Sequence, residues 1–190
     1  MTTLPDLVTD RLRLRQPAET DLEAMLTVFN DPVIAANTIS IPHPYTRDDA
    51  LGALEQFERW RREGVNRVFF IEDRATGALV GSASVEHKDP PGRGELGYVV
   101  GRAWRGRGYA SEAARAIVRF AFDSLGLRLV TAHAMLHNPA SVRVLEKLGM
   151  RAVGVIPDAC RKDGESFDAH GFEITRDEWA RLDAAQEHPA

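Results

Sequence analysis

The alternation of apolar and polar residues predicts how the chain begins. Within Arg11–Arg15, Leu12 and Leu14 alternate with arginines, which is the period of a strand with one solvated face. Glu19–Asn30 then carries apolar residues at helical spacing. We therefore expect a strand followed by a helix.

The next stretch contains several prolines. Asp31-Pro32 is expected to end the first helix, because a residue that precedes proline disfavours helical backbone. Later prolines predict that the chain stays irregular as far as Thr46, which can cap a helix over Arg47–Glu63.

Three short apolar runs follow, separated by turn residues, and they predict an antiparallel meander. These runs are Val68–Ile71, Leu79–Val85 and Leu96–Val100.

After Val100 the pattern alternates between helices and strands. A glycine-rich turn leads into a helix over Gly108–Leu125, a strand over Arg128–Met135 and a helix over Pro139–Leu148. Asn138 occupies the expected N-cap of the last helix, and Gly149 lies just past its end. Two further strands, Ala152–Ile156 and Phe167–Ile174, precede a short helix with Trp179. The sum is a mixed sheet with helices on both faces.

Composition narrows the class of protein. The chain has 190 residues, of which 44% are hydrophobic and 27% charged, enough for one substantial core. We expect one domain over residues 1–183 and a polar tail over 184–190. The net charge of −4 argues against a protein that coats nucleic acid.

Cysteine and histidine usage gives no sign of a metal centre. A single cysteine, Cys160, excludes an internal disulfide and a thiolate cluster for zinc. His133 and His137 fall on a strand and its exit rather than on one helix, so no metal is expected there. Without a signal peptide or a membrane-spanning apolar run, the expected location is the cytoplasm.

The glycine-rich turn is a candidate anion site. In Arg105-Gly106-Arg107-Gly108-Tyr109-Ala110 the glycines allow a phosphate to approach main-chain N–H groups at a helix start. Arg105 and Arg107 can add charge at its rim. When this segment is considered alone, a plain solvated turn is the alternative. Asn138 and Ser141 likewise have a structural alternative, because they can simply cap a helix.

Several segments together resemble the GNAT superfamily of N-acetyltransferases, and more narrowly its RimJ/RimL-like branch. The ends of the chain, at Thr9–Arg15 and Phe172–Trp179, are similar to the two ends of that branch. The other matching segments are Glu95-Leu96-Gly97-Tyr98-Val99-Val100, Trp104–Ala114, Asn138-Pro139-Ala140-Ser141 and Val144–Met150.

The resemblance implies a single GNAT-like domain of the α/β (α+β) class, with about seven mostly antiparallel strands. It also implies a site for acetyl-CoA as co-substrate, with no metal. Main-chain N–H groups of the turn Arg105–Ala110 would bind the pyrophosphate, although Ala110 stands where glycine is commoner. Val99 and Val100 would pair with the pantetheine arm, which Asn138 would also bond. Ser141 would lie near the thioester sulfur.

Acetyl transfer to an amine needs a proton acceptor and an acid for the thiolate. Glu95 is in phase with Gly97 and Val99 on the strand that leads to the coenzyme, so it is the candidate base. Alternatively, Glu95 is a solvated residue on the far face or only holds the cationic amine. Glu86 and His87 are the reserve bases, and Ser141 is the candidate acid.

The acceptor is a primary amine in the leading hypothesis. An α-amine is about a tenth neutral at pH 7, whereas a lysine is neutral only about once in 2000. A weaker base is therefore sufficient for a protein N-terminus. The best-known members of the branch modify such termini. Small amines such as antibiotics, polyamines or amino acids are the first alternative, and a non-catalytic acyl-CoA-binding regulatory module is the second. No nucleic-acid or membrane partner is expected, and the protein would be a monomer or a homodimer.

Overall fold

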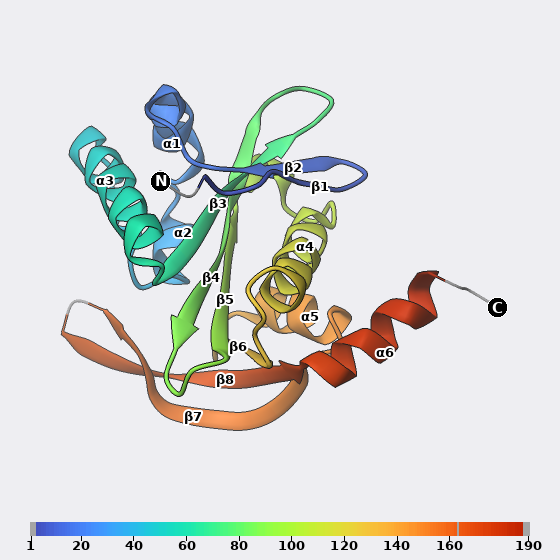
Figure 1. Ribbon diagram of the computed structural model, residues 1–190. Coiled ribbons are helices and arrows are strands. Elements are labelled where there is room, and N and C mark those ends of the chain that lie inside the picture. Colours follow the sequence, from blue (N-terminus) through green and yellow to red (C-terminus); the bar gives the residue numbers. More distant parts are fainter. Residues whose placement is uncertain (1–2, 163, 188–190) are drawn as a thin grey trace.

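The structure, a computed structural model, describes residues 3–162 and 164–187 (Figure 1). One sheet of eight strands has the order β1-β2-β3-β4-β5-β6-β8-β7. The strands are β1 Leu7–Val8, β2 Leu12–Arg15, β3 Asn66–Asp73, β4 Leu79–Lys88, β5 Arg93–Val100, β6 Leu129–Met135, β7 Arg151–Lys162 and β8 Glu165–Thr175. The helices are η1 Glu19–Asp21, α1 Leu22–Val28, α2 Pro32–Ala36, α3 Arg47–Glu63, η2 Arg102–Trp104, α4 Tyr109–Asp123, α5 Pro139–Lys147 and α6 Arg176–Glu187.

The sheet is antiparallel except between two neighbouring strands, β5 and β6. β5 and β6 run parallel and pair only over Arg93–Glu95 and Leu129–Thr131. Beyond this short contact, β5 continues to Val100 and β6 to Met135 without pairing to each other. One edge of β5 is therefore left without a strand partner in the middle of the sheet.

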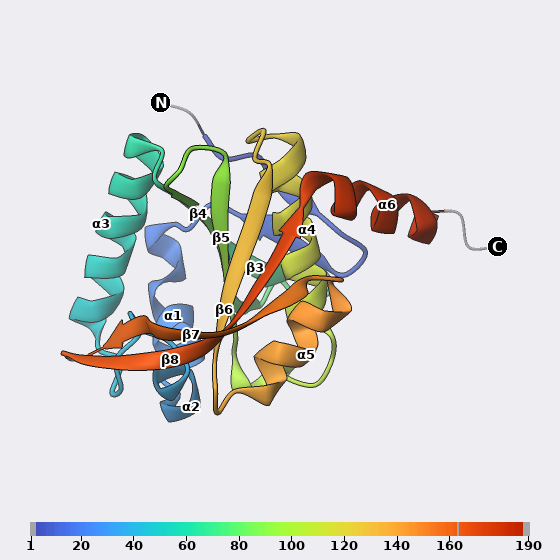
Figure 2. The ribbon, with the colours of Figure 1, turned by 90° about the horizontal axis from the view of Figure 1, so that it is seen from below.

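Helices cover both faces of the sheet. Figures 1 and 2 show α4, α5 and α6 on one face, with α1, α2 and α3 on the other. On the first face, Ile117 of α4 and Phe69 of β3 belong to the larger apolar core. On the second face, Met25 of α1 and Phe70 of β3 belong to a smaller one. The alternation of Phe69 and Phe70 along β3 divides the two cores, because successive strand residues face opposite sides.

A long hairpin of β7 and β8 reaches across to the side of α2 and α3 (Figures 1 and 2). At the end of β7, the Lys162 ammonium donates to the carbonyl oxygens of Ala35 and Thr38, the latter at 3.1 Å. It also donates to Ile41 O at 3.5 Å. The hairpin is thus attached to the end of α2 and to the segment that follows it.

The predicted fold class is confirmed, with eight strands where about seven were expected. The predicted caps are confirmed too: Thr46 accepts from Asp49 N and Asn138 accepts from Ser141 N. The additional strand is β1, whose two residues are too few to give a periodic signal.

The prediction that the chain is irregular between Asp31 and Thr46 was wrong in one place. Asp31-Pro32 ends one helix but also begins the next, α2. The Asp31 side chain accepts from Val33 N at 2.8 Å. Pro32 suits the first helical turn because its missing N–H would have no helical partner there.

At the C-terminus, α6 continues to Glu187. Residues 188–190 of the predicted tail lie outside the described part of the chain, and the domain limit at residue 183 stays a prediction. Within residues 3–162 and 164–187, no helix combines the length and apolar character needed to cross a membrane.

Candidate active site

The glycine-rich turn adopts the backbone expected of an anion site. Gly106 and Gly108 have φ of 75° and 81°, in the left-handed region that favours glycine, and α4 begins at Tyr109. A Cβ placed on Gly106 would meet no atom within 4 Å. The turn is therefore open on its outer side, next to the positive end of a helix dipole.

The two arginines of the turn have different surroundings. Arg105 donates from Nη2 to Asp31 Oδ2 at 2.8 Å and from Nε to Val100 O at 3.1 Å. It therefore braces the turn against β5 and the start of α2. Arg107 is exposed, so its charge is directed to solvent at the mouth of the turn.

Arg11, which sequence reasoning did not assign to the site, lies beside the turn. Its Nη1 donates to Arg107 O at 2.9 Å, and its guanidinium lies 4.7 Å from the centroid of the Tyr109 ring. Glu112 of α4 accepts from Arg11 Nε at 2.7 Å. The strand β2 is thereby attached to the beginning of α4.

Tyr109 turns its side chain into the protein. Its hydroxyl donates to Asp73 Oδ2 at 2.5 Å, at the end of β3. This hydrogen bond holds the pKa of Asp73 below its ordinary value. Tyr109 can therefore offer a ligand only its main-chain N–H, as can the half-buried Ala110 that follows.

The unpaired edge of β5 can be assigned residue by residue. Gly94 O accepts from the Thr131 hydroxyl of β6 at 3.3 Å, so the main chain of Gly94 faces that edge. Main-chain groups alternate along a strand, so those of Tyr98 and Val100 face the same edge. Those of Val99 face β4 instead. Tyr98 and Val100, rather than Val99, therefore have main-chain groups on the unpaired edge. The Val100 carbonyl already accepts from Arg105 Nε, so Val100 offers its N–H to an extended ligand.

Asn138 and Ser141 lie across this edge, at the start of α5. Ser141 N donates to Asn138 Oδ1 at 3.1 Å, and Ser141 Oγ lies 2.8 Å from the Tyr98 hydroxyl. The same hydroxyl donates to Ser141 O at 3.2 Å. Burial raises the pKa of Tyr98 to about 12, so the phenol keeps its proton. Sequence reasoning missed Tyr98 because its partner is 43 residues away.

Glu95 lies where β5 and β6 diverge, and it is ion-paired. Its Oε1 is 3.3 Å from His133 Nδ1 on β6, and its Oε2 is 3.5 Å from Lys88 Nζ on β4. Its side chain is 32% exposed. Burial opposes ionisation, but the hydrogen bond to His133 and the charge of Lys88 hold the pKa of Glu95 below its ordinary value. At neutral pH this carboxylate is charged.

The two reserve bases lie on β4 beside Glu95. Glu86 pairs across the sheet with Glu95 and accepts from Lys88 Nζ at 2.9 Å. His87 faces the opposite side, because successive strand side chains alternate. Burial and the charge of Arg67 lower the pKa of His87.

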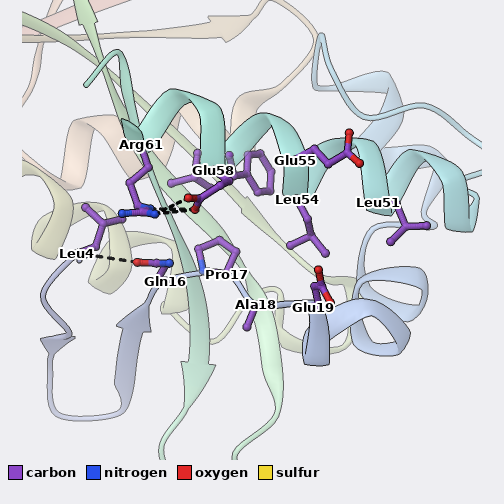
Figure 3. A pocket seen from close by; sticks show the side chains of 12 residues that line it. Leu4, Gln16, Pro17, Ala18, Glu19, Leu51, Leu54, Glu55, Glu58 and Arg61 are labelled. Carbon is purple, nitrogen blue, oxygen red and sulfur yellow. Dashed lines mark hydrogen bonds and ion pairs between the residues drawn. The ribbon is translucent and has the colours of Figure 1, made fainter. Parts of the chain in front are cut away.

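Two cavities lie outside this arrangement. One of about 390 Å³ lies at the ends of β6 and β8, between Met135–His137 and Ser166–Asp168. The other, of about 340 Å³, lies between α3 and the segment Gln16–Glu19 (Figure 3). None of the predicted site residues lines either of them. In the part of the chain that the structure describes, no group of three His, Cys, Asp or Glu side chains could hold a metal ion.

Comparison with known proteins gives a family match over most of the chain. Residues 11–151 match the family described as acetyltransferase (GNAT) domain. The uncharacterized N-acetyltransferase YoaA of Bacillus subtilis is 31% identical over 183 residues, which cover 90% of this chain and 97% of that protein. The L-amino acid N-acetyltransferase AaaT of Escherichia coli is 23% identical, over 83% of this chain and 93% of its own.

Solved structures share the fold at lower identity. One is RimL, a ribosomal L7/L12 α-N-protein acetyltransferase, in complex with coenzyme A. Its TM-score is 0.80 at 15% identity, over 92% of this chain and 99% of that chain. This likeness shows a common fold.

Proposed function

Since the chain belongs to the GNAT acetyltransferase family, we propose that it moves the acetyl group of acetyl-CoA to the α-amine of a peptide or protein N-terminus. The observation that carries this proposal is the unpaired edge of β5. The anion site at Gly106 and Gly108 lies at one end of this edge, and the charged pair of Glu95 and His133 lies at the other. Acetyl-CoA fits this arrangement, because its phosphate end can lie at the glycine turn and its thioester end can lie near Glu95 and His133.

The residues along the edge fit the coenzyme. The open space outside Gly106 and the N–H groups at the start of α4 suit a pyrophosphate. The main chains of Tyr98 and Val100 can pair with the amide groups of the pantetheine arm, as an added strand would. Asn138 lies on the opposite side of the arm's path, where it also caps α5. When bound, the coenzyme supplies an acetyl thioester whose carbonyl carbon accepts the amine.

The acid side of the reaction is assigned to Ser141 with Tyr98 behind it. A proton must reach the departing thiolate, and the Ser141 hydroxyl is 2.8 Å from the half-buried phenol of Tyr98, which stays protonated. The Tyr98 hydroxyl has one hydrogen, so it donates to Ser141 Oγ in place of Ser141 O when Ser141 donates outward. This arrangement holds a proton at Ser141 Oγ on the α5 side of the gap.

The base side lies on the other face of the sheet, around Glu95. A carboxylate whose pKa is held below its ordinary value removes a proton from an amine only weakly. An α-amine has a pKa of about 8, so a weaker base can deprotonate it than a lysine side chain would need. The negative charge of Glu95 also suits the cationic form in which the amine arrives.

A second candidate is a small amine, and the β7–β8 hairpin favours it. The contacts of Lys162 with Ala35 and Thr38 bring the hairpin against the end of α2 and the segment after it, on the face of the sheet that carries Glu95. This bridge restricts the width of an acceptor there. The AaaT relative is named for amino-acid acetylation, whereas RimL is named for a protein α-amine.

Release of free thiol from acetyl-CoA separates these candidates. The panel contains short peptides with free N-termini, the same peptides with a blocked α-amine, single amino acids and polyamines. We expect turnover with the free peptides and none with the blocked ones. Turnover confined to amino acids or polyamines would replace the peptide with the small-amine candidate.

A further inference from the structure

We propose that His133 is the catalytic group that takes the proton from the acceptor's ammonium, and that Glu95 is the positioning residue that holds it. This inference rests on the proposed function and deepens its base side. In this proposal the general base is the His133 imidazole, and not Glu95 as the sequence predicted.

The contact between the two side chains determines which nitrogen of the ring is free. His133 Nδ1 lies 3.3 Å from Glu95 Oε1. An ionised carboxylate can only accept a hydrogen bond, so a neutral imidazole in this contact carries its hydrogen on Nδ1. The lone pair is then on Nε2, for which no hydrogen bond is found within residues 3–162 and 164–187. The His133 side chain is 27% exposed, so the imidazole is open to an amine that approaches from solvent.

The position of His133 suits the reaction. β5 and β6 separate after Glu95 and Thr131, and His133 is the next residue of β6 on the same face as Thr131. The larger core lies on the other face, with Val130 and Ala132. His133 therefore borders the opening between the strands from the side opposite Tyr98 and Ser141.

Charged and titratable groups face His133 from the strands around it. Glu95 is the direct partner, and Lys88 of β4 already pairs with Glu86 and with the second oxygen of Glu95. On the hairpin side, β8 presents Glu173, which is ion-paired to Arg151 of β7. Cys160 of β7 also lies near Glu95, and burial together with that charge raises the pKa of its thiol. The thiol is therefore neutral at pH 7.

The first proton of the ammonium goes to His133: an N–H bond breaks, its electron pair stays on the amine nitrogen, and the proton bonds to the lone pair of His133 Nε2. The neutral amine then forms a C–N bond to the carbonyl carbon, and the C–S bond of the thioester breaks. Ser141 gives its proton to the thiolate, and the second proton that the nitrogen loses on becoming an amide replaces the proton of Ser141. The imidazolium returns its proton to water, so no oxidant or other reactant is needed.

The test compares His133→Ala, Glu95→Gln and a matched control, His170→Ala, in the full chain. His170 is opposite Ala134 in the β6–β8 register and so faces the other side of the sheet. We expect His133→Ala to lower kcat about 100-fold at pH 7. The loss should shrink at pH 9, where about nine tenths of an α-amine is already neutral. Added imidazole should restore part of the activity of His133→Ala only.

Two further readouts exclude a structural explanation. Calorimetric titration with acetyl-CoA and the thermal unfolding midpoint should be the same in His133→Ala and the wild type. Glu95→Gln should lose less activity than His133→Ala, and the double variant should be no slower than His133→Ala.

The proposal is overturned if His133→Ala keeps its kcat, or if its loss is independent of pH and imidazole. It is also overturned if Glu95→Gln alone removes all turnover. Failure of the proposed function looks different: the wild type itself would then release no thiol with any free-amine peptide.

Discussion

The Tyr98 hydroxyl lies 2.8 Å from Ser141 Oγ, and this contact joins the middle of β5 to the start of α5 across the unpaired edge. It places a half-buried hydroxyl behind Ser141, the residue that we propose as the acid. The opposite side of the same edge carries Glu95 and His133. The proposed acid and the proposed base therefore lie on opposite sides of the gap between β5 and β6.

Tyr98→Phe removes the hydroxyl and keeps the ring. We expect kcat to fall about tenfold, less than for a full general acid, because a coenzyme A thiolate is already an acceptable leaving group. Ser141→Ala should lose a similar factor. The double variant should lose little more than either, since both changes break one proton path. Steady-state kinetics with coenzyme titration tests this, and fully multiplicative losses would show independent roles.

Gly106→Glu places a side chain and a negative charge in the open space of the turn. We expect the Kd for acetyl-CoA to rise at least about 100-fold, because the carboxylate repels the pyrophosphate and blocks the N–H groups. Gly77→Glu is the matched control. Gly77 also has a positive φ, 71°, and open space around its Cβ, but it lies in the turn between β3 and β4. Equal weakening in both variants would contradict the placement of the anion site.

Tyr109→Phe removes the hydrogen bond to Asp73. We expect the thermal unfolding midpoint at pH 7 to fall by about 3 °C, typical of one hydrogen bond in a domain of this size. The pKa of Asp73 is lower in the folded state than in the unfolded state. The hydrogen bond therefore stabilises the fold fully when the pH is above the unfolded-state pKa, and this stabilisation is lost as the pH falls through the folded-state pKa. The difference from wild type should therefore narrow below about pH 4. Unfolding scans at pH 7 and pH 3 check this, and a constant difference would contradict it.

Lys162→Met releases the β7–β8 hairpin from the carbonyl oxygens of Ala35, at the end of α2, and Thr38, just after it. If the hairpin shapes the acceptor site, KM for the amine should rise about tenfold, while the Kd for acetyl-CoA stays the same. Lys147→Met, at the exposed end of α5, is the control for loss of one positive charge. A change in coenzyme affinity without a change in acceptor KM would place the hairpin's role elsewhere.

Features that depend on neighbouring residues were predictable from the sequence. The Thr46 and Asn138 caps and the turn at Gly106 and Gly108 follow from backbone requirements within a few residues. Asp31-Pro32 was misinterpreted because the same pair is compatible with a helix end and a helix start.

Features that depend on distant residues were not predictable. Arg11 reaches Glu112 over 101 residues, and Tyr98 reaches Ser141 over 43. His133 was considered only as a metal ligand. Its link to Glu95 arises from the parallel pairing of β5 with β6, a tertiary contact that no local pattern encodes.

The position of the transferred acetyl group tests the central claim most directly. Wild-type protein is incubated with acetyl-CoA and a peptide that has a free N-terminus and one internal lysine, and the product is fragmented by mass spectrometry. We expect a single acetyl group on the α-nitrogen of the first residue. Acetylation of the lysine with an unmodified N-terminus, or no acetylated peptide at all, would contradict the assignment of an α-amine as the acceptor.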